Sequence, residues 1–167
     1  MRDDPVEARV RAALEALGVP YEILPCDPAL ADTAVFCEHY GYPPGNSANT
    51  IVVAGKTGDK HAAACVVLAT TRLDVNHTVR KRLGARRVSF ASAEQTRELT
   101  GMDLGGVTPI GLPPELPLWV DRGVMERDYV ILGGGSRAAK LKVSPEIFRH
   151  TPNTAIVDGL ARDADCS

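Results

Sequence analysis

The strongest chemical signal in the sequence is a loop rich in glycine and proline at residues 104–113. Glycine permits a positive φ and a close approach of backbone to ligand, and Pro109 fixes its own φ and has no amide donor. The remaining amides can therefore form a rigid cradle for a carbonyl, carboxylate or ester oxygen. The candidate residues are Gly105, Gly106, Val107, Thr108 and Pro109. A plain connection between a helix and a strand fits the same stretch equally well.

The cysteine and histidine residues show no metal-ligand spacing. No Cys-x-x-Cys pair is present, and Cys65 lies inside an apolar run, as a buried thiol commonly does. His61 and His77 can act as bases in principle, but the sequence places no carboxylate beside either, so partly exposed histidines are the favoured interpretation. The sequence predicts reduced thiols, no metal and no cofactor.

Composition sets the class of protein. The chain has 167 residues, 44% hydrophobic and 24% charged, with a net charge of -2, which is typical of a globular domain. The overall charge gives no reason to expect nucleic acid, so RNA would have to bind a local patch. No apolar run approaches the roughly 18 residues that cross a bilayer, so we expect no membrane contact and a cytoplasmic location.

The elements that must position the loop follow from periodicity. Residues 5–17 predict an amphipathic helix, residues 21–24 a short strand, and residues 33–40 a second helix. The apolar runs 50–54 and 61–69 predict an antiparallel hairpin, because a short glycine-rich segment joins them.

The second half continues the alternation of helix and strand. Helices are predicted at 74–83, at 93–100 behind a capping box, and from Ser144 onward. Strands are predicted at 87–90, 118–120, 129–132 and 141–143, and the tail after about residue 157 is predicted to be loose. The fold class is therefore α/β, a mixed sheet flanked by helices within a single domain spanning 1–167.

The order of these elements, with two glycine motifs, resembles the YbaK/prolyl-tRNA-synthetase-associated domain family over roughly residues 5–157. The Gly-x-x-x-Pro motif of that family corresponds to Gly105 and Pro109, and its C-terminal glycine turn to residues 133–137. The resemblance implies a barrel-like mixed β-sheet and hydrolysis of the ester that joins a wrong amino acid to the 3′ end of a tRNA. The implied partner is the acceptor end of an aminoacyl-tRNA; the oligomeric state is not defined.

The sequence departs from this pattern at Asn49, where many members carry a lysine just before the first hairpin strand. Asparagine donates hydrogen bonds but has no charge, and losing a charge-assisted contact costs on the order of 1.5 to 3 kcal/mol. Three interpretations stay open. Asn49 orients the ester or terminal ribose, Lys140 supplies the charge, or the site binds without hydrolysing.

Further candidates come from the regions that border the pocket in relatives. The resemblance assigns substrate contacts to Asp32, Thr33, Gly134, Ser136, Arg137 and Lys140. Asp32 and Thr33 serve equally well as helix caps, Arg137 and Lys140 as cover for a strand edge, and Thr108 as a turn residue bonding its own backbone.

A cluster of cations is the candidate RNA contact. It comprises Arg80, Lys81 and Arg82, with Arg86 and Arg87 close behind. The alternative is a solvated helix end whose cations favour the helix dipole. The sequence thus predicts a trans-acting aminoacyl-tRNA deacylase, with a non-catalytic tRNA- or aminoacyl-binding module as the alternative and a glycine-loop nucleotide binder disfavoured by its motifs.

Overall fold

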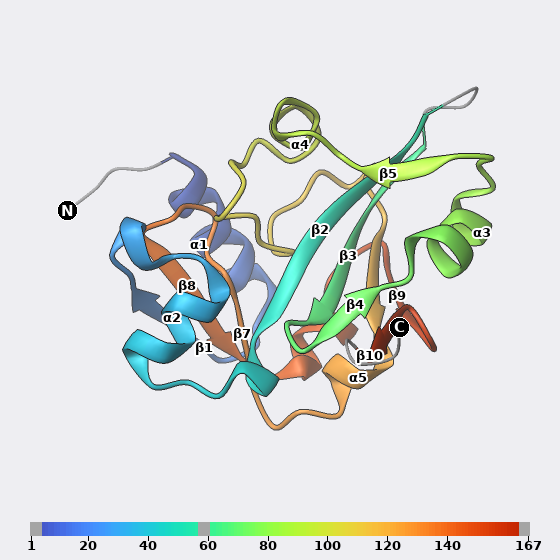
Figure 1. Cartoon of the computed structure of the whole chain (residues 1–167). Coiled ribbons are helices and arrows are strands. Elements are labelled where there is room, and N and C mark those ends of the chain that lie inside the picture. The colour runs from blue at the N-terminus through green and yellow to red at the C-terminus, as the bar shows by residue number, and fades with distance from the viewer. Residues whose placement is uncertain (1–4, 57–60, 164–167) are drawn as a thin grey trace.

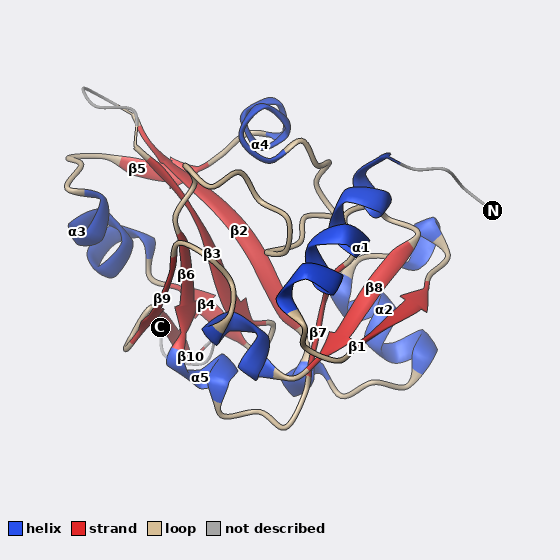
Figure 2. Cartoon of the chain, turned by 180° about the vertical axis from the view of Figure 1, so that it is seen from behind, coloured by secondary structure: helices blue, strands red, loops and turns tan. Residues whose placement is uncertain are grey.

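The computed structural model describes residues 5–56 and 61–163, and its sheets carry helices on their faces (Figure 1). In a first sheet all neighbours are antiparallel, in the order β1-β8-β7. Its strands are β1 (Tyr21–Pro25), β7 (Val130–Gly133) and β8 (Ala139–Val143). Helix α1 (Pro5–Leu17) covers one face and α2 (Thr33–Tyr40) the other (Figure 2).

The alternation of side chains along β8 explains this layering. Leu141 and Val143 join Val10 and Leu14 of α1 in the main core. The intervening side chains point the opposite way, as period-two alternation requires, so Lys140 lies on the face that α2 covers.

The second sheet is mixed and has the order β5-β2-β3-β6-β9. Its strands are β2 (Ala48–Gly55), β3 (Ala62–Leu68), β5 (Val88–Phe90), β6 (Leu118–Asp121) and β9 (Thr154–Val157). The β2–β3 pair is antiparallel, which confirms the predicted hairpin, although residues 57–60 of its connection lie outside the described residues. Strand β6 runs parallel to both β3 and β9.

The barrel-like closure implied by the family resemblance is not confirmed. A single isolated bridge, between Ser47 and Ile131, joins the first sheet to the second in the described part of the chain. A barrel needs continuous pairing around its circumference, and one bridge leaves the two sheets open. The fold is a mixed α/β arrangement in which the sheets meet at the start of β2.

The remaining elements include β4 (Thr71–Leu73), α3 (Arg80–Leu83), α4 (Ala93–Thr100), α5 (Arg122–Met125) and β10 (Ala161–Asp163). The predicted helix 74–83 is a π-helical turn at residues 75–79 followed by α3, and the helix predicted from Ser144 is a 3-10 turn at residues 145–149. The capping box at Ser92 is confirmed.

The prediction of a loose tail after residue 157 is wrong for residues 158–163. Strand β10 pairs with β4, Leu160 is fully buried, and the Ala161 amide donates to the Asp121 carboxylate at 3.0 Å. These contacts stabilise the segment through partners that lie far away in sequence. No helix in the described residues is long and apolar enough to span a membrane.

Candidate functional site

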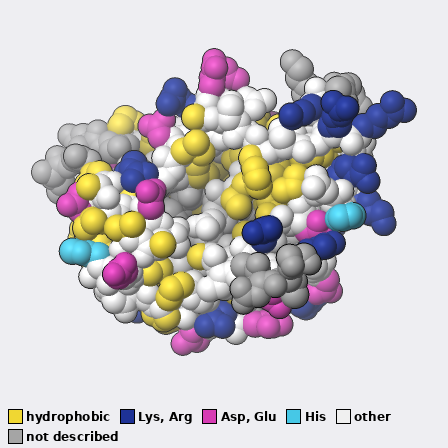
Figure 3. All heavy atoms as spheres, viewed as in Figure 1, with side chains coloured by type: hydrophobic (Ala, Val, Ile, Leu, Met, Phe, Trp, Pro, Cys, Tyr) yellow, Lys and Arg dark blue, Asp and Glu magenta, His cyan; other side chains and the backbone are white. Residues whose placement is uncertain are grey.

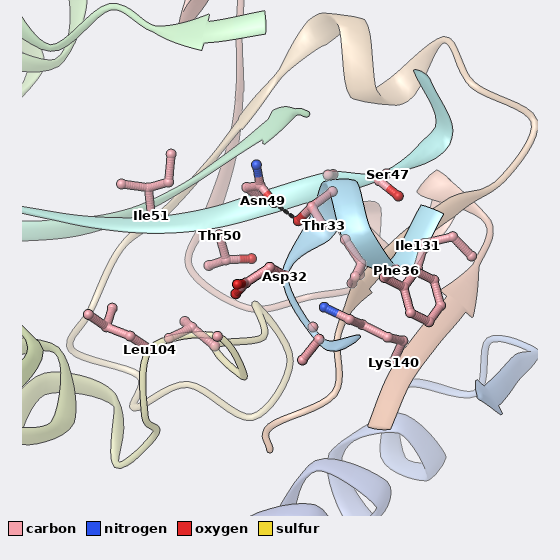
Figure 4. Close-up of a pocket in the computed structure, with 16 residues that line it drawn as sticks. Asp32, Thr33, Phe36, Ser47, Asn49, Thr50, Ile51, Leu104, Ile131 and Lys140 are labelled. Atoms are coloured by element: carbon pink, nitrogen blue, oxygen red, sulfur yellow. Dashed lines mark hydrogen bonds between the residues drawn. The ribbon is translucent and has the colours of Figure 1, made fainter. Parts of the chain in front are cut away.

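A pocket of about 240 Å³ opens where the two sheets meet. Its walls come from α2, β2, β7, β8 and the loop that follows α4 (Figure 4). The surrounding surface is recessed and bordered by hydrophobic side chains (Figure 3). The structure brings together these predicted site residues in its lining: Asp32, Thr33, Asn49, Gly105, Val107 and Lys140.

The glycine loop contributes Gly105 and Val107 to the lining of this pocket. The Gly106 amide donates to the Asp103 carbonyl at 3.0 Å and the Thr108 amide contacts the Met102 sulfur at 3.4 Å. The amides of Gly105 and Val107 have no hydrogen-bond partner among residues 5–56 and 61–163. Both residues line the pocket, so main-chain donors remain for a ligand oxygen.

The second glycine loop holds the first in place. The Gly135 amide donates to the Gly106 carbonyl at 2.7 Å, and a Cβ on Gly106 would lie 2.7 Å from the Ser136 carbonyl carbon. A Cβ on Gly134 would lie 2.5 Å from the Ala139 carbonyl oxygen. Gly134 and Ser136 lie outside the pocket lining, and the Ser136 hydroxyl bonds Glu7 of α1. The loops pack backbone against backbone, which is possible because glycine has no side chain.

Thr108 and Pro109 also lie outside the pocket lining. Thr108 is fully buried, and its hydroxyl accepts from the Ile110 amide at 3.4 Å, which is a turn contact. Their contribution to the cradle is therefore the shape of the loop.

Asn49 lies at the start of β2 and faces α2. The Thr33 hydroxyl donates to its Oδ1 at 2.7 Å, while its Nδ2 makes no hydrogen bond within the described residues. Thr50, which sequence reasoning missed, points into the pocket from β2, and its buried Oγ1 has no hydrogen-bond partner in the part of the chain that the structure describes (Figure 4). Its signal in the sequence was a hydroxyl at the head of an apolar strand. A buried hydroxyl without a partner costs free energy that a ligand can recover.

Lys140 is 7% exposed, and its ammonium lies 5.5 Å from the centre of the Phe36 ring. Burial lowers its pKa below the ordinary 10.5, because desolvation disfavours the charged form. Asp32, at the mouth, is instead paired with Arg137 at 3.4 Å. Arg137 also donates to the Pro28 carbonyl at 3.1 Å, so it braces the mouth without lining the pocket.

The structure does not bring the cationic cluster to the pocket. Arg80, Lys81 and Arg82 lie on α3, on the far side of the second sheet from α2 (Figure 1). Arg82 stacks on Trp119 at 5.1 Å from the ring centre. His77 is exposed, in agreement with the favoured interpretation, but the structure adds a carboxylate that the sequence did not place there, since Asp74 lies 3.2 Å from its Nδ1.

The family model described as an aminoacyl-tRNA editing domain matches residues 27–150. This range includes all the residues that line the pocket. The chain belongs to the aminoacyl-tRNA editing domain family. In this editing domain, α1 and β10 lie outside the matched range and pack against it.

Similar proteins support the same assignment. The chain is 26% identical over 117 residues to "Putative Cys-tRNA(Pro)/Cys-tRNA(Cys) deacylase EbsC" of Enterococcus faecalis, covering 70% of this chain and 69% of the relative. A solved structure described as "hypothetical protein APE2540" superposes with a TM-score of 0.82 and 29% identity, covering 92% of this chain and 99% of that chain. A solved structure described as a "putative trans-editing enzyme for prolyl tRNA synthetase" superposes with a TM-score of 0.77 and 26% identity, covering 93% of this chain and 98% of that chain.

The editing-domain pocket has no conventional catalytic set. No histidine lines it, and no group of three or more His, Cys, Asp or Glu side chains suited to a metal occurs in the described ranges. Polar contacts to a ligand must therefore come from amides, an asparagine, hydroxyls, a carboxylate and a lysine. Chemically, such a set can bind and polarise a carbonyl or ester oxygen without a nucleophilic side chain.

Proposed function

We propose that this editing domain is a trans-acting aminoacyl-tRNA deacylase that hydrolyses the ester of mischarged tRNA in the cytoplasm. The supporting observation is a small pocket lined by Gly105 and Val107, two residues whose main-chain amides have no hydrogen-bond partner among the described residues. Preorganised donors of this kind stabilise an oxyanion as it forms, and they need no reorganisation at the moment of reaction.

The reaction balances without a cofactor. Water attacks the carbonyl carbon and gives up a proton to solvent, and the C=O electron pair moves to the oxygen to form a tetrahedral oxyanion. Collapse of that intermediate breaks the bond to the ribose oxygen, which takes up a proton and leaves free amino acid and tRNA. Because an aminoacyl ester is already activated, positioning and charge stabilisation supply the remaining catalysis.

The test is a deacylation screen with seryl, alanyl, cysteinyl and threonyl esters on several tRNAs. We expect turnover of at least one small aminoacyl ester, because a pocket of about 240 Å³ filters substrates by size. Esters of large aromatic amino acids are the matched controls and should remain intact. Failure to release any amino acid would exclude the deacylase.

A non-catalytic binding module is the second candidate, and Asn49 favours it. The side chain is neutral, and its Oδ1 is already engaged by Thr33. A module would bind tRNA or a non-hydrolysable aminoacyl-adenosine in the screen above without releasing amino acid. The same two measurements, binding and release, therefore separate the candidates.

We predict that Asn49→Ala lowers kcat/KM for deacylation by about tenfold, because one neutral hydrogen bond from Nδ2 to the substrate is lost. Thr33→Val is the matched control. It removes the Thr33–Asn49 bond and keeps both the amide and the side-chain volume. Unchanged kinetics in Asn49→Ala would remove this residue from the site. Deacylation that appears in Asn49→Lys but is absent from the parent would favour the binding module.

We also propose that Arg80 and Lys81 contact tRNA phosphates. Arg80 shares a surface hollow with Lys56, Arg86 and Arg87. Reversing both charges, in Arg80→Glu/Lys81→Glu, should weaken tRNA binding about tenfold at low salt. The plot of log affinity against log salt concentration should also become less steep by about 1.5, because each lost phosphate contact reduces the magnitude of its slope by about 0.7 to 0.9.

Filter binding across a salt series measures this effect. The control is Arg122→Glu/Arg149→Glu, which reverses cations that pair with surface carboxylates elsewhere. An equal loss of affinity in both double variants would show a general charge effect. Unchanged tRNA affinity in Arg80→Glu/Lys81→Glu would show that these cations only form a solvated helix end.

A further inference from the structure

We propose that the ammonium of Lys140 binds the acyl oxygen of the substrate and stabilises the oxyanion, acting from the wall opposite β2. This inference rests on the proposed deacylase function and assigns a catalytic residue to it. Lys140 lines the pocket, is 7% exposed, and reaches from β8 toward the cavity that Thr50 enters from β2 (Figure 4).

The Lys140 ammonium has no ion-pair or hydrogen-bond partner among residues 5–56 and 61–163. Within the described ranges no carboxylate lies within 4.0 Å of it and no acceptor receives a hydrogen bond from it. Asp32 is directed to Arg137, and Phe36 offers the face of its ring at 5.5 Å. Removing a cation from water without pairing it is costly, and a cation–π contact offsets this cost in part. An apolar side chain of the same length would pack here at lower cost, so the charge points to a ligand.

The placement of charge around the pocket orients an aminoacyl ester. The substrate carries an α-ammonium, which Lys140 repels and the carboxylate of Asp32 attracts. Asp32 occupies the N-cap position of α2 at the mouth without a side-chain hydrogen bond to the helix, and its side chain is 75% exposed, whereas Lys140 is buried in the wall. The α-ammonium therefore lies toward the mouth and the carbonyl toward Lys140. The charge that develops on that oxygen during attack by water then meets the ammonium.

Several groups facing Lys140 set its charge state. Burial lowers the pKa most, and Arg137 lowers it further. The pKa of Lys140 is raised in part by three groups, which are Cys26 just after β1, Asp32 at the start of α2 and Cys37 within α2. With a pKa below the ordinary 10.5, Lys140 loses its proton at a lower pH than an exposed lysine. The alkaline limb of the deacylation profile should follow this loss, after subtraction of spontaneous ester hydrolysis.

The experiment compares Lys140→Met with Lys142→Met. Lys142 lies two residues along the same strand and on the same face, with its ammonium 4.7 Å from the Tyr129 ring, but it does not line the pocket. We expect Lys140→Met to lower kcat on the order of 10²-fold with little change in KM, the pattern of a contact made mainly in the transition state. Its Tm should equal or exceed that of the parent, because a desolvated cation has been removed. Lys142→Met should keep kcat within about twofold of the parent.

Three results would overturn the assignment. The first is a Lys140→Met variant that retains kcat and the alkaline limb. The second is a Lys140→Met variant that loses activity together with Tm or far-ultraviolet ellipticity, since that pattern identifies a structural lysine. The third is a parent protein that hydrolyses no ester, which would overturn the proposed deacylase function as a whole. An active parent with an equally active Lys140→Met variant would instead overturn only the assignment of Lys140.

Discussion

Replacing Gly133 with alanine is expected to lower deacylation on the order of 10²-fold and to lower the free energy of unfolding by about 1 to 3 kcal/mol. Gly133 ends β7 and lines the pocket against the glycine loop. An added Cβ would overlap the Val107 carbonyl oxygen and lie 3.0 Å from its carbon. Because both neighbours are backbone, no side-chain rotation relieves the overlap, and the Val107 carbonyl must move together with the adjoining backbone of Val107. Its amide is one of the proposed oxyanion donors.

Gly84→Ala is the matched control for this prediction. Gly84 has a φ of +67° at the end of α3, and a Cβ there would meet nothing within 4 Å. Alanine at this position costs about 1 to 2 kcal/mol of backbone strain without touching the pocket. Urea unfolding and steady-state deacylation measure the two effects separately. Equal activity in both variants would show that the contact between the glycine loops does not position the pocket.

The sequence predicted much of the pocket because some of its residues carry local signals. The Gly-x-x-x-Pro loop and the residue before the hairpin are recognisable without a fold, and they led to Gly105, Val107 and Asn49, which line the same cavity. The role of Gly133 was not predictable, because it depends on how closely two loops approach. Thr50 was missed because the absence of a hydrogen-bond partner for its hydroxyl, as seen among the described residues, is a property of the packed structure.

In the fold, too, the elements with local sequence signals were predicted and those that depend on distant partners were not. Helix α1, the β2–β3 hairpin and the capping box at Ser92 have signals within about a dozen residues, and all three form as predicted. The pairing of β10 with β4 joins residue 161 to residue 73, and no local pattern specifies such a partner. Sheet closure likewise depends on long-range register, and here the two sheets share only the Ser47–Ile131 bridge within the described residues.

Asp74 links that unpredicted strand to the rest of the molecule. Its side chain is 8% exposed and accepts from the Thr78 hydroxyl at 3.0 Å. The His77 Nδ1 and the Arg162 guanidinium each lie 3.2 Å from the Asp74 carboxylate oxygens. Burial alone would raise the pKa of this carboxyl, but the hydrogen bonds from Thr78 and His77 and the charge of Arg162 outweigh it, so the pKa falls below 3.8. The folded state therefore favours the ionised carboxylate.

Asp74→Ala is expected to lower the free energy of unfolding at pH 7 by about 2 to 4 kcal/mol, because it removes a buried carboxylate and leaves its donors unpaired. Asp103→Ala, at an exposed pair with Arg97, is the control and should cost less than about 1 kcal/mol. A depressed carboxyl pKa gives stability that is present above the unfolded value and lost as pH falls through the folded value. The difference in the free energy of unfolding between the parent and Asp74→Ala should thus be constant from pH 7 to about 5 and become smaller below pH 4. A gap that stays constant in urea titrations down to pH 2.5 would show that the neutral side chain stabilises the β4–β10 junction as well as the charged one.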